Sequence, residues 1–279
     1  MSSLALALVL TAAVLHAAWN AMVKAGNDRA LILACVAIAH TVVGAAMIAV
    51  APAPAPASWP YIAASGALHY LYYILLFLAY RIGDLSQVYP IARGLSPLLV
   101  SIGAFLFAGE LLSLPAAAGI ALISGGIALL SFVGRRAPTA QPAALAAAVS
   151  TGVVIASYSL VDGIGVRLSE SAFGYTGWLF VSEALVVAVV ARRRWGQLRP
   201  LARPIATYTL LAGVSAVSAY ALVIYANLLA PLGAVSAVRE VSVVVAAGIG
   251  VLIFGERPWK SRVFAAAAVT AGVVLLAAN

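Results

Sequence analysis

The chain has 279 residues, of which 65% are hydrophobic and only 9% are charged, and its mean hydropathy is +1.10. A soluble domain carries about 25% charged residues, so most of this surface cannot face water, and we predict an all-α integral membrane protein. The net charge of +8 indicates basic cytoplasmic loops rather than a nucleic-acid partner. The single cysteine, Cys35, excludes a disulfide framework and a thiolate metal site.

The apolar segments follow one another with short connections and predict ten membrane spans. About 20 apolar residues cross a bilayer, which places spans at residues 4–24, 30–51, 60–80, 85–109, 113–133, 141–162, 172–191, 205–228, 232–254 and 259–278. Met1 leads into the first span with no basic residue before it. We therefore expect that span to be retained rather than cleaved as a signal peptide.

The positive charges predict how these spans are oriented. Of the 16 Lys and Arg residues, Arg93 and Arg239 lie inside spans and Arg167 lies in a loop after an even-numbered span. The remaining 13 (16 less 3) lie in or beside loops after odd-numbered spans. Since basic residues concentrate in cytoplasmic loops, we expect both termini on the extracytoplasmic side of a bacterial-type inner membrane.

The fourth and ninth spans are copies of one sequence. Residues 83–110 read GDLSQVYPIARGLSPLLVSIGAFLFAGE, and residues 229–256 read LAPLGAVSAVREVSVVVAAGIGVLIFGE. In this alignment Arg93 falls on Arg239 and Ser96 on Ser242, and weaker matches elsewhere pair Gly66 with Gly213 and Tyr73 with Tyr220. We predict two repeats, residues 1–137 and 138–279, each with five spans. Because five is odd, the repeats insert in opposite orientations, as in secondary transporters with a site near the bilayer midplane.

These motifs, together with the Gly-Glu pairs at 109–110 and 255–256, resemble the EamA-type transporters of the drug/metabolite transporter superfamily along essentially the whole chain. The resemblance implies export of small metabolites, amino acids including aromatic ones among them, through a central cavity between the repeats. The alternative is a channel for small solutes, which would need a continuous polar stripe, whereas here the polar residues cluster at mid-depth. We expect no enzyme activity, no cofactor and no ATP-driven engine, because no Walker sequence occurs.

Ionisable residues inside spans are costly and indicate either a functional site or an internal pair. Arg93 is flanked by Pro90 and Pro97, so we expect a locally opened helix there. Its guanidinium could hold a substrate carboxylate, pair with the other repeat, or tether backbone carbonyls. Arg239 is followed by Glu240, and adjacent helix positions point about 100° apart. We expect a regular helix there and an arginine neutralised within the protein.

Aromatic and polar side chains complete the predicted site, because buried Tyr and Trp offer a ring with one polar group. Interhelical packing is the alternative role for all of them. The substrate-binding candidates are His16, Trp19, Asn20, His69, Tyr72, Tyr73, Tyr80, Tyr89, Arg93, Ser96, Tyr158, Tyr220 and Arg239.

Three further ionisable residues lie in predicted spans but are not among the substrate-binding candidates. Glu183 is a candidate for proton coupling, because a carboxylate desolvated inside a membrane protein can exchange a proton. Asp162, near the end of its span, is also a candidate for carrying a proton, although we expect it at the membrane interface, and His40 is expected to be packed in the core. The predicted partners are a small-molecule substrate and the lipid bilayer, with no metal, and a monomer is compatible with this plan.

Overall fold

The computed structural model describes residues 1–25, 29–82, 85–130, 142–185, 187–189, 192, 203–252 and 259–278. These residues form helices and no strand. In chain order the helices are α1 (Ser3–Ala25), α2 (Arg29–Val50), the 3₁₀ turn η1 (Pro56–Ser58), α3 (Trp59–Ile82), α4 (Leu85–Ala108), α5 (Leu114–Leu130), α6 (Pro142–Leu168), α7 (Ala172–Ser182), α9 (Arg203–Ala226), α10 (Leu232–Arg239), α11 (Val241–Leu252) and α12 (Trp259–Ala277).

The helices confirm the predicted all-helical membrane class. Within the described residues, seven helical segments are long and apolar enough to cross a membrane: Ser3–Ala25, Ile32–Val50, Pro90–Ala108, Leu145–Leu168, Ala172–Val189, Thr209–Ala226 and Leu232–Leu252. Two shorter apolar helices, Leu114–Leu129 and Val263–Ala277, accompany them. Helices suit this environment because every backbone polar group is satisfied within the segment. The chain is therefore a multi-pass membrane protein.

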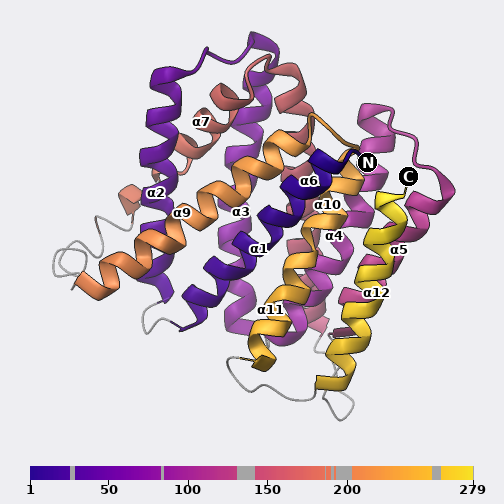
Figure 1. Ribbon diagram of the computed structural model, residues 1–279. Coiled ribbons are helices and arrows are strands. Elements are labelled where there is room, and N and C mark those ends of the chain that lie inside the picture. Colours follow the sequence, from indigo (N-terminus) through magenta and orange to yellow (C-terminus); the bar gives the residue numbers. More distant parts are fainter. Residues whose placement is uncertain are drawn as a thin grey trace.

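Successive helices alternate in direction, with α10 and α11 together forming one pass, so the chain runs back and forth between two ends of the molecule (Figure 1). Both termini lie at the same end, together with the connections around residues 51–58, 109–113, 169–171 and 227–231 (Figure 1). Large hydrophobic side chains such as Phe105, Phe107 and Phe264 are exposed, as expected for faces that contact lipid.

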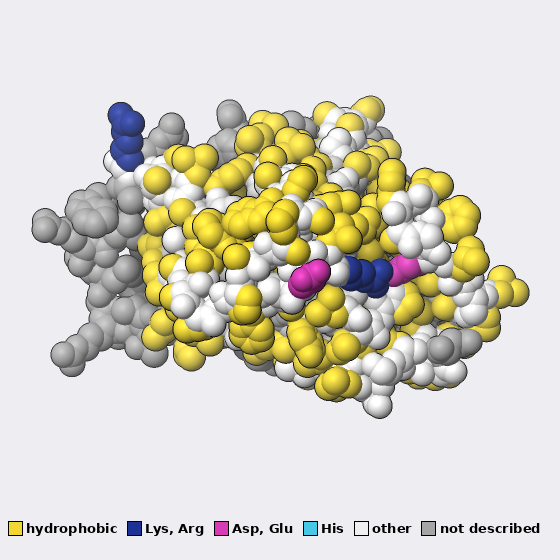
Figure 2. Space-filling model, turned by 90° about the horizontal axis from the view of Figure 1, so that it is seen from above, with side chains coloured by type: hydrophobic (Ala, Val, Ile, Leu, Met, Phe, Trp, Pro, Cys, Tyr) yellow, Lys and Arg dark blue, Asp and Glu magenta, His cyan; other side chains and the backbone are white. Residues whose placement is uncertain are grey.

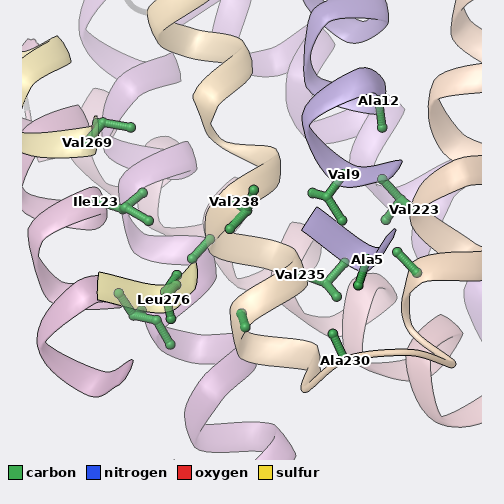
Figure 3. Close-up of a cluster of buried hydrophobic side chains, with 14 of the residues drawn as sticks. Ala5, Val9, Ala12, Ile123, Val223, Ala230, Val235, Val238, Val269 and Leu276 are labelled. Atoms are coloured by element: carbon green, nitrogen blue, oxygen red, sulfur yellow. The ribbon is translucent and has the colours of Figure 1, made fainter. Parts of the chain in front are cut away.

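The centre of the molecule is built around α10, whose eight residues are all buried. Val235 packs against Ala5 and Val9 of α1, and Val238 faces Ile123 of α5 (Figure 3). This cluster joins α10 to α1 and α9 on one side and to α5 and α12 on the other (Figure 3). The packing fixes the last residue of α10, Arg239, at the middle of the fold.

Glycines let two helix pairs approach to backbone contact. A Cβ added at Gly119 of α5 would lie 2.8 Å from the carbonyl oxygen of Gly272 in α12, and one added at Gly272 would lie 2.5 Å from that of Gly119. The same reciprocal approach joins Gly44 of α2 to Gly177 of α7, at 2.7 and 3.1 Å. Small residues of this kind allow close packing of membrane helices.

The helix break in the structure does not lie where the sequence predicted it. Helix α4 continues through Pro90 and Pro97, whereas the second-half helix breaks at Glu240, between α10 and α11. A proline removes one backbone donor, and a packed membrane helix tolerates that loss. At Glu240 the backbone tightens, because its N–H bonds to the Ala237 carbonyl at 3.0 Å and its own carbonyl accepts from Val243 at 2.9 Å. The prediction of an open helix at Arg93 and a regular one at Arg239 was therefore wrong.

Candidate functional site

Two arginines and one glutamate meet in the buried centre. Arg93, Arg239 and Glu240 are only 4%, 5% and 0% exposed. The Nε atom of Arg93 lies 2.6 Å from Oε2 of Glu240, and the Nε atom of Arg239 lies 4.0 Å from Oε1. Arg93 therefore forms the close ion pair, across the two halves of the chain, and Arg239 the distant one. This reverses the expectation that Arg239 would be the neutralised arginine, because the break at Glu240 directs its carboxylate toward α4.

Each guanidinium also donates to a serine of the second half. Nη2 of Arg93 donates to Oγ of Ser242 at 3.2 Å, and Nη2 of Arg239 donates to Oγ of Ser159 at 3.4 Å. The Nε atom of Arg239 is buried and has no hydrogen-bond partner within the described part of the chain. Arg239 thus keeps unused donor capacity at the centre of the fold.

Arg239 faces a small cavity between α6, α9 and α10. Its lining residues are Ser159, Asp162, Tyr220, Val223, Ile224, Asn227, Leu232, Val235, Ser236 and Arg239. Its volume of about 10 Å³ is near the lower limit for one water molecule. A larger solute can enter only if the surrounding helices move apart.

Asp162 provides the negative charge of this cavity. It is 1% exposed, and its two carboxylate oxygens accept hydrogen bonds from the Tyr175 hydroxyl at 3.0 Å and the Tyr220 hydroxyl at 2.5 Å. The predicted end of the span at residue 162 was wrong, and the position of Asp162 relative to the membrane interface stays a prediction. Helix α6 continues to Leu168, so Asp162 lies well inside it rather than at its end.

An aromatic layer lies beside the cavity and joins α3, α6 and α9. The His69 ring stacks on Tyr158 at 4.3 Å between centroids and meets Tyr220 edge-on at 5.7 Å. Tyr72 contacts Tyr158 edge-on at 6.1 Å. The structure therefore brings together these predicted aromatic residues. Tyr220 lines the cavity itself, and His69, Tyr72 and Tyr158 lie next to it.

The predicted residues of α1 are bonded to one another. Nε1 of Trp19 donates to Nδ1 of His16 at 3.3 Å, and Nδ2 of Asn20 donates to the His16 carbonyl at 2.8 Å. His16 is within electrostatic reach of both Arg93 and Arg239. This face of α1 therefore borders the arginine centre.

The remaining predicted residues are not part of the cavity. Ser96 is fully buried in α4, and its hydroxyl has no partner among the described residues. The side chains of Tyr80 and Tyr89 lie outside the described part of the structure. Tyr73 lies close to Glu183 rather than to the cavity. No cluster of His, Cys, Asp and Glu suited to a metal ion occurs in the described ranges.

Glu183 and His40 form a second buried pair, 8% exposed each. Nδ1 of His40 lies 3.1 Å from Oε2 of Glu183, and its ring packs on Phe180 at 4.7 Å. Glu183 occupies the C-cap of α7, with its N–H directed at the Phe180 and Val181 carbonyls. His40 is packed, as predicted, but it also has a charged partner, which the sequence did not predict.

A third group closes the end of the molecule that carries the termini. Nη1 of Arg167 donates to Oε1 of Glu110 at 2.6 Å, and its Nε and Nη2 donate to the Asn227 and Ala230 carbonyls at 2.8 and 2.9 Å. Oε2 of Glu110 accepts from the Leu232 N–H at 2.8 Å, at the start of α10. Basic and acidic side chains lie side by side on this mostly hydrophobic face (Figure 2). Since Asn227 and Leu232 also line the cavity, these bonds connect the cavity lining to this end of the molecule.

Several of these residues could have been found from the repeat alone. Ser242 is the equivalent of Ser96, and Ser159 aligns with Asn20. Glu240 is a carboxylate inside an apolar run, which is itself a signal of function or pairing. Of the two tyrosines that bind Asp162, Tyr220 was a predicted site residue, whereas nothing local in the sequence indicated Tyr175.

Comparisons with known proteins identify the fold but not the family. No family model and no curated protein matches the sequence. The structure resembles a solved one described only as "Crystal structure of protein", with a TM-score of 0.74 and 17% sequence identity. The likeness covers 99% of this chain and 96% of that one. The two chains share a fold along their whole length.

Proposed function

We propose that the chain is a secondary transporter for small zwitterionic metabolites, amino acids with hydrophobic or aromatic side chains foremost. It has ten spans in two inverted repeats and belongs with the EamA-type transporters that its motifs resemble. Its site is the cavity between α6, α9 and α10, and the halves move to open it alternately to either side. The observation that carries this proposal is that a buried Arg239 with an unused donor and a buried Asp162 line one cavity.

The inverted repeat is supported by the pattern of helix contacts. Three helices pack against their own repeat equivalents: α2 against α7, α4 against α10, and α5 against α12. The contact between α3 and α6 has its counterpart in the contact between α9 and α1. In the same way, the contact between α4 and α6 has its counterpart in the contacts of α10 and α11 with α1. The paired equivalents run in opposite directions (Figure 1), as a two-fold axis in the membrane plane requires. The reciprocal approaches of Gly119 to Gly272 and of Gly44 to Gly177 are what two-fold related surfaces produce.

The charges of the cavity match an α-amino acid. Ser159, which binds Arg239, and Asp162 are three residues apart on α6, about 4.5 Å along the helix axis at 1.5 Å per residue. A guanidinium binds a carboxylate with charge-assisted hydrogen bonds, and Asp162 can accept from an ammonium group. The aromatic layer of His69, Tyr72, Tyr158 and Tyr220 offers rings beside the cavity for the substrate side chain.

A carrier explains the closed centre better than a channel. The polar cavity holds about one water, and an ion cluster and packed apolar side chains surround it. A channel requires a continuous polar path, whereas a carrier requires a midplane site and two arrangements of its halves. Export across a bacterial-type inner membrane, with both termini extracytoplasmic, follows from the charge bias and from the resemblance.

Counterflow in proteoliposomes tests this proposal. Labelled L-phenylalanine should accumulate transiently against an excess of unlabelled L-phenylalanine inside, with saturable kinetics. Phenethylamine lacks the carboxylate and 3-phenylpropionate lacks the ammonium, so neither should compete well. Arg239→Gln should weaken L-phenylalanine exchange at least about tenfold, the loss of one charge-assisted contact of about 1.5–3 kcal/mol. Glu170→Gln, which removes an exposed carboxylate away from the cavity, is the control and should exchange normally. Non-saturable flux would indicate a channel, and equal competition by all three compounds would contradict zwitterion recognition.

A further inference from the structure

We infer that Glu183 and His40 form a proton-binding site, separate from the solute cavity, that couples transport to protons. Proton binding stands on the geometry of the pair alone, whereas the coupling rests on the proposed function. The site joins α2 to the break at the end of α7.

The pair can hold one proton in two neutral arrangements. Either His40 is positive beside the Glu183 carboxylate, or a neutral His40 faces a protonated Glu183. Loss of that proton leaves one negative charge among buried side chains, which is costly unless another positive charge is near. Nε2 of His40 is buried and has no hydrogen-bond partner in the described residues. A proton on this nitrogen would therefore not compete with a hydrogen bond to another described group.

The neighbouring titratable groups connect this pair to the solute cavity. From α3, Tyr73, His69 and Tyr70 are all close enough to Glu183 to interact with it electrostatically. From α9, Tyr220 packs against Phe180, one turn before Glu183. From α6, Tyr158 stacks on His69, and Asp162 interacts electrostatically with the same ring.

His69 is the shared element of the two sites. Its ring acts on both Glu183 and Asp162, and its Nδ1 lies 3.2 Å from Oγ of Ser65. An ammonium group arriving at Asp162 adds a positive charge on one side of this ring and disfavours the proton on the other side. By linkage, a proton at Glu183 and His40 equally disfavours the solute. The expected result is exchange of one proton for one solute, with the proton released to the aqueous side that is open.

Infrared spectroscopy of the purified protein tests proton binding without any solute. A pH titration should show a band of the protonated pair, from a carboxylic acid or an imidazolium, that is present in the parent and in Glu170→Gln and lost in Glu183→Gln. His40→Gln should shift the midpoint of this titration, whereas a histidine that only packs leaves it unchanged. The assignment is overturned if Glu183→Gln titrates with the same bands as the parent, or if the midpoint does not move in His40→Gln. The His40→Gln variant keeps the test decisive if Glu183→Gln does not fold.

Proteoliposomes test the coupling. With one proton per solute, a gradient of one pH unit should drive about tenfold accumulation of L-phenylalanine, since one unit of pH is a factor of ten in proton activity. Exchange should depend on pH in the parent and be independent of pH in Glu183→Gln. If counterflow works in the parent but a pH gradient drives no accumulation, the coupling is wrong while the transport function stands. If counterflow itself fails, the proposed function is wrong, and the infrared titration still decides whether Glu183 binds a proton.

Discussion

We expect Glu240→Leu to be much less stable than the double variant Arg93→Met with Glu240→Leu. Glu240 is fully buried, and its Oε2 lies 2.6 Å from Nε of Arg93. Removing one partner of a buried ion pair costs about 3–5 kcal/mol, because the other charge stays buried without its counter-charge, whereas replacing both by apolar residues is often nearly neutral. Arg239 also loses a carboxylate at 4.0 Å, which places Glu240→Leu at the upper end of that range.

The double variant isolates the Arg93–Glu240 interaction. It leaves Arg239 bonded to Ser159, so some loss should remain, and we expect a coupling energy of about 2–3 kcal/mol between the two substitutions, at the high end for contacting residues. Reversible unfolding in mixed micelles, followed by far-UV circular dichroism and tryptophan fluorescence, measures all four free energies of the cycle.

A second cycle on the Glu110–Arg167 pair provides a matched control. This pair has the same N–O distance of 2.6 Å, but its side chains are 14% and 32% exposed. More exposed pairs contribute about 0–1 kcal/mol, so its coupling should be the smaller of the two. If the losses at Arg93 and Glu240 simply add, or if both cycles give the same coupling, burial does not strengthen the interaction of the central pair.

Three other predictions concern the topology, the helix packing and the aromatic layer. A phosphatase fused to the C-terminus should be active and a green fluorescent protein dark, and the reverse pattern would contradict the charge bias. Gly119→Ala should destabilise the fold by about 1–3 kcal/mol, because its Cβ would meet the Gly272 carbonyl at 2.8 Å. Gly125→Ala, whose Cβ would have nothing within 4 Å, should be neutral. Equal melting temperatures of the two variants would refute the backbone contact. His69→Ala should raise the half-saturation concentration more for L-phenylalanine than for L-alanine, and an equal rise would return this ring to a packing role.

Helix positions could be predicted closely from the sequence, because bilayer thickness and hydropathy fix them. The first predicted span, 4–24, became α1 at Ser3–Ala25, and the last, 259–278, became α12 at Trp259–Ala277. The C-terminal end of α6 was missed by six residues, at Leu168 instead of 162. The last turns there contain Gly163, Gly165 and Arg167, which lower the hydropathy. Arg167 is satisfied by Glu110, which lies 57 residues away in sequence, and no local pattern reveals that contact.

The sequence predicted those parts of the candidate site in which the two aligned segments carry the same residue. The repeat identified Arg93 and Arg239 as equivalents, but the equivalent of Glu240 is Gly94. Gly94 packs closely on α5, where an added Cβ would meet the Ser124 carbonyl at 2.9 Å, whereas Glu240 pairs with Arg93 across the repeats. One carboxylate therefore serves two arginines. Which arginine receives it depends on how α4 and α10 approach each other, and a sequence alignment does not contain that geometry.

The charges of the centre are the reason why we propose a zwitterionic solute. Arg93, Arg239, Glu240 and Asp162 are all buried, and their formal charges sum to zero. A solute that is only an anion or only a cation would leave one uncompensated charge in a low-dielectric interior, whereas an amino acid adds equal charges of both signs. The net charge of the interior can then change at the Glu183–His40 pair, through its proton. In the proposed mechanism, a neutral solute is exchanged for a proton while every other buried charge stays paired.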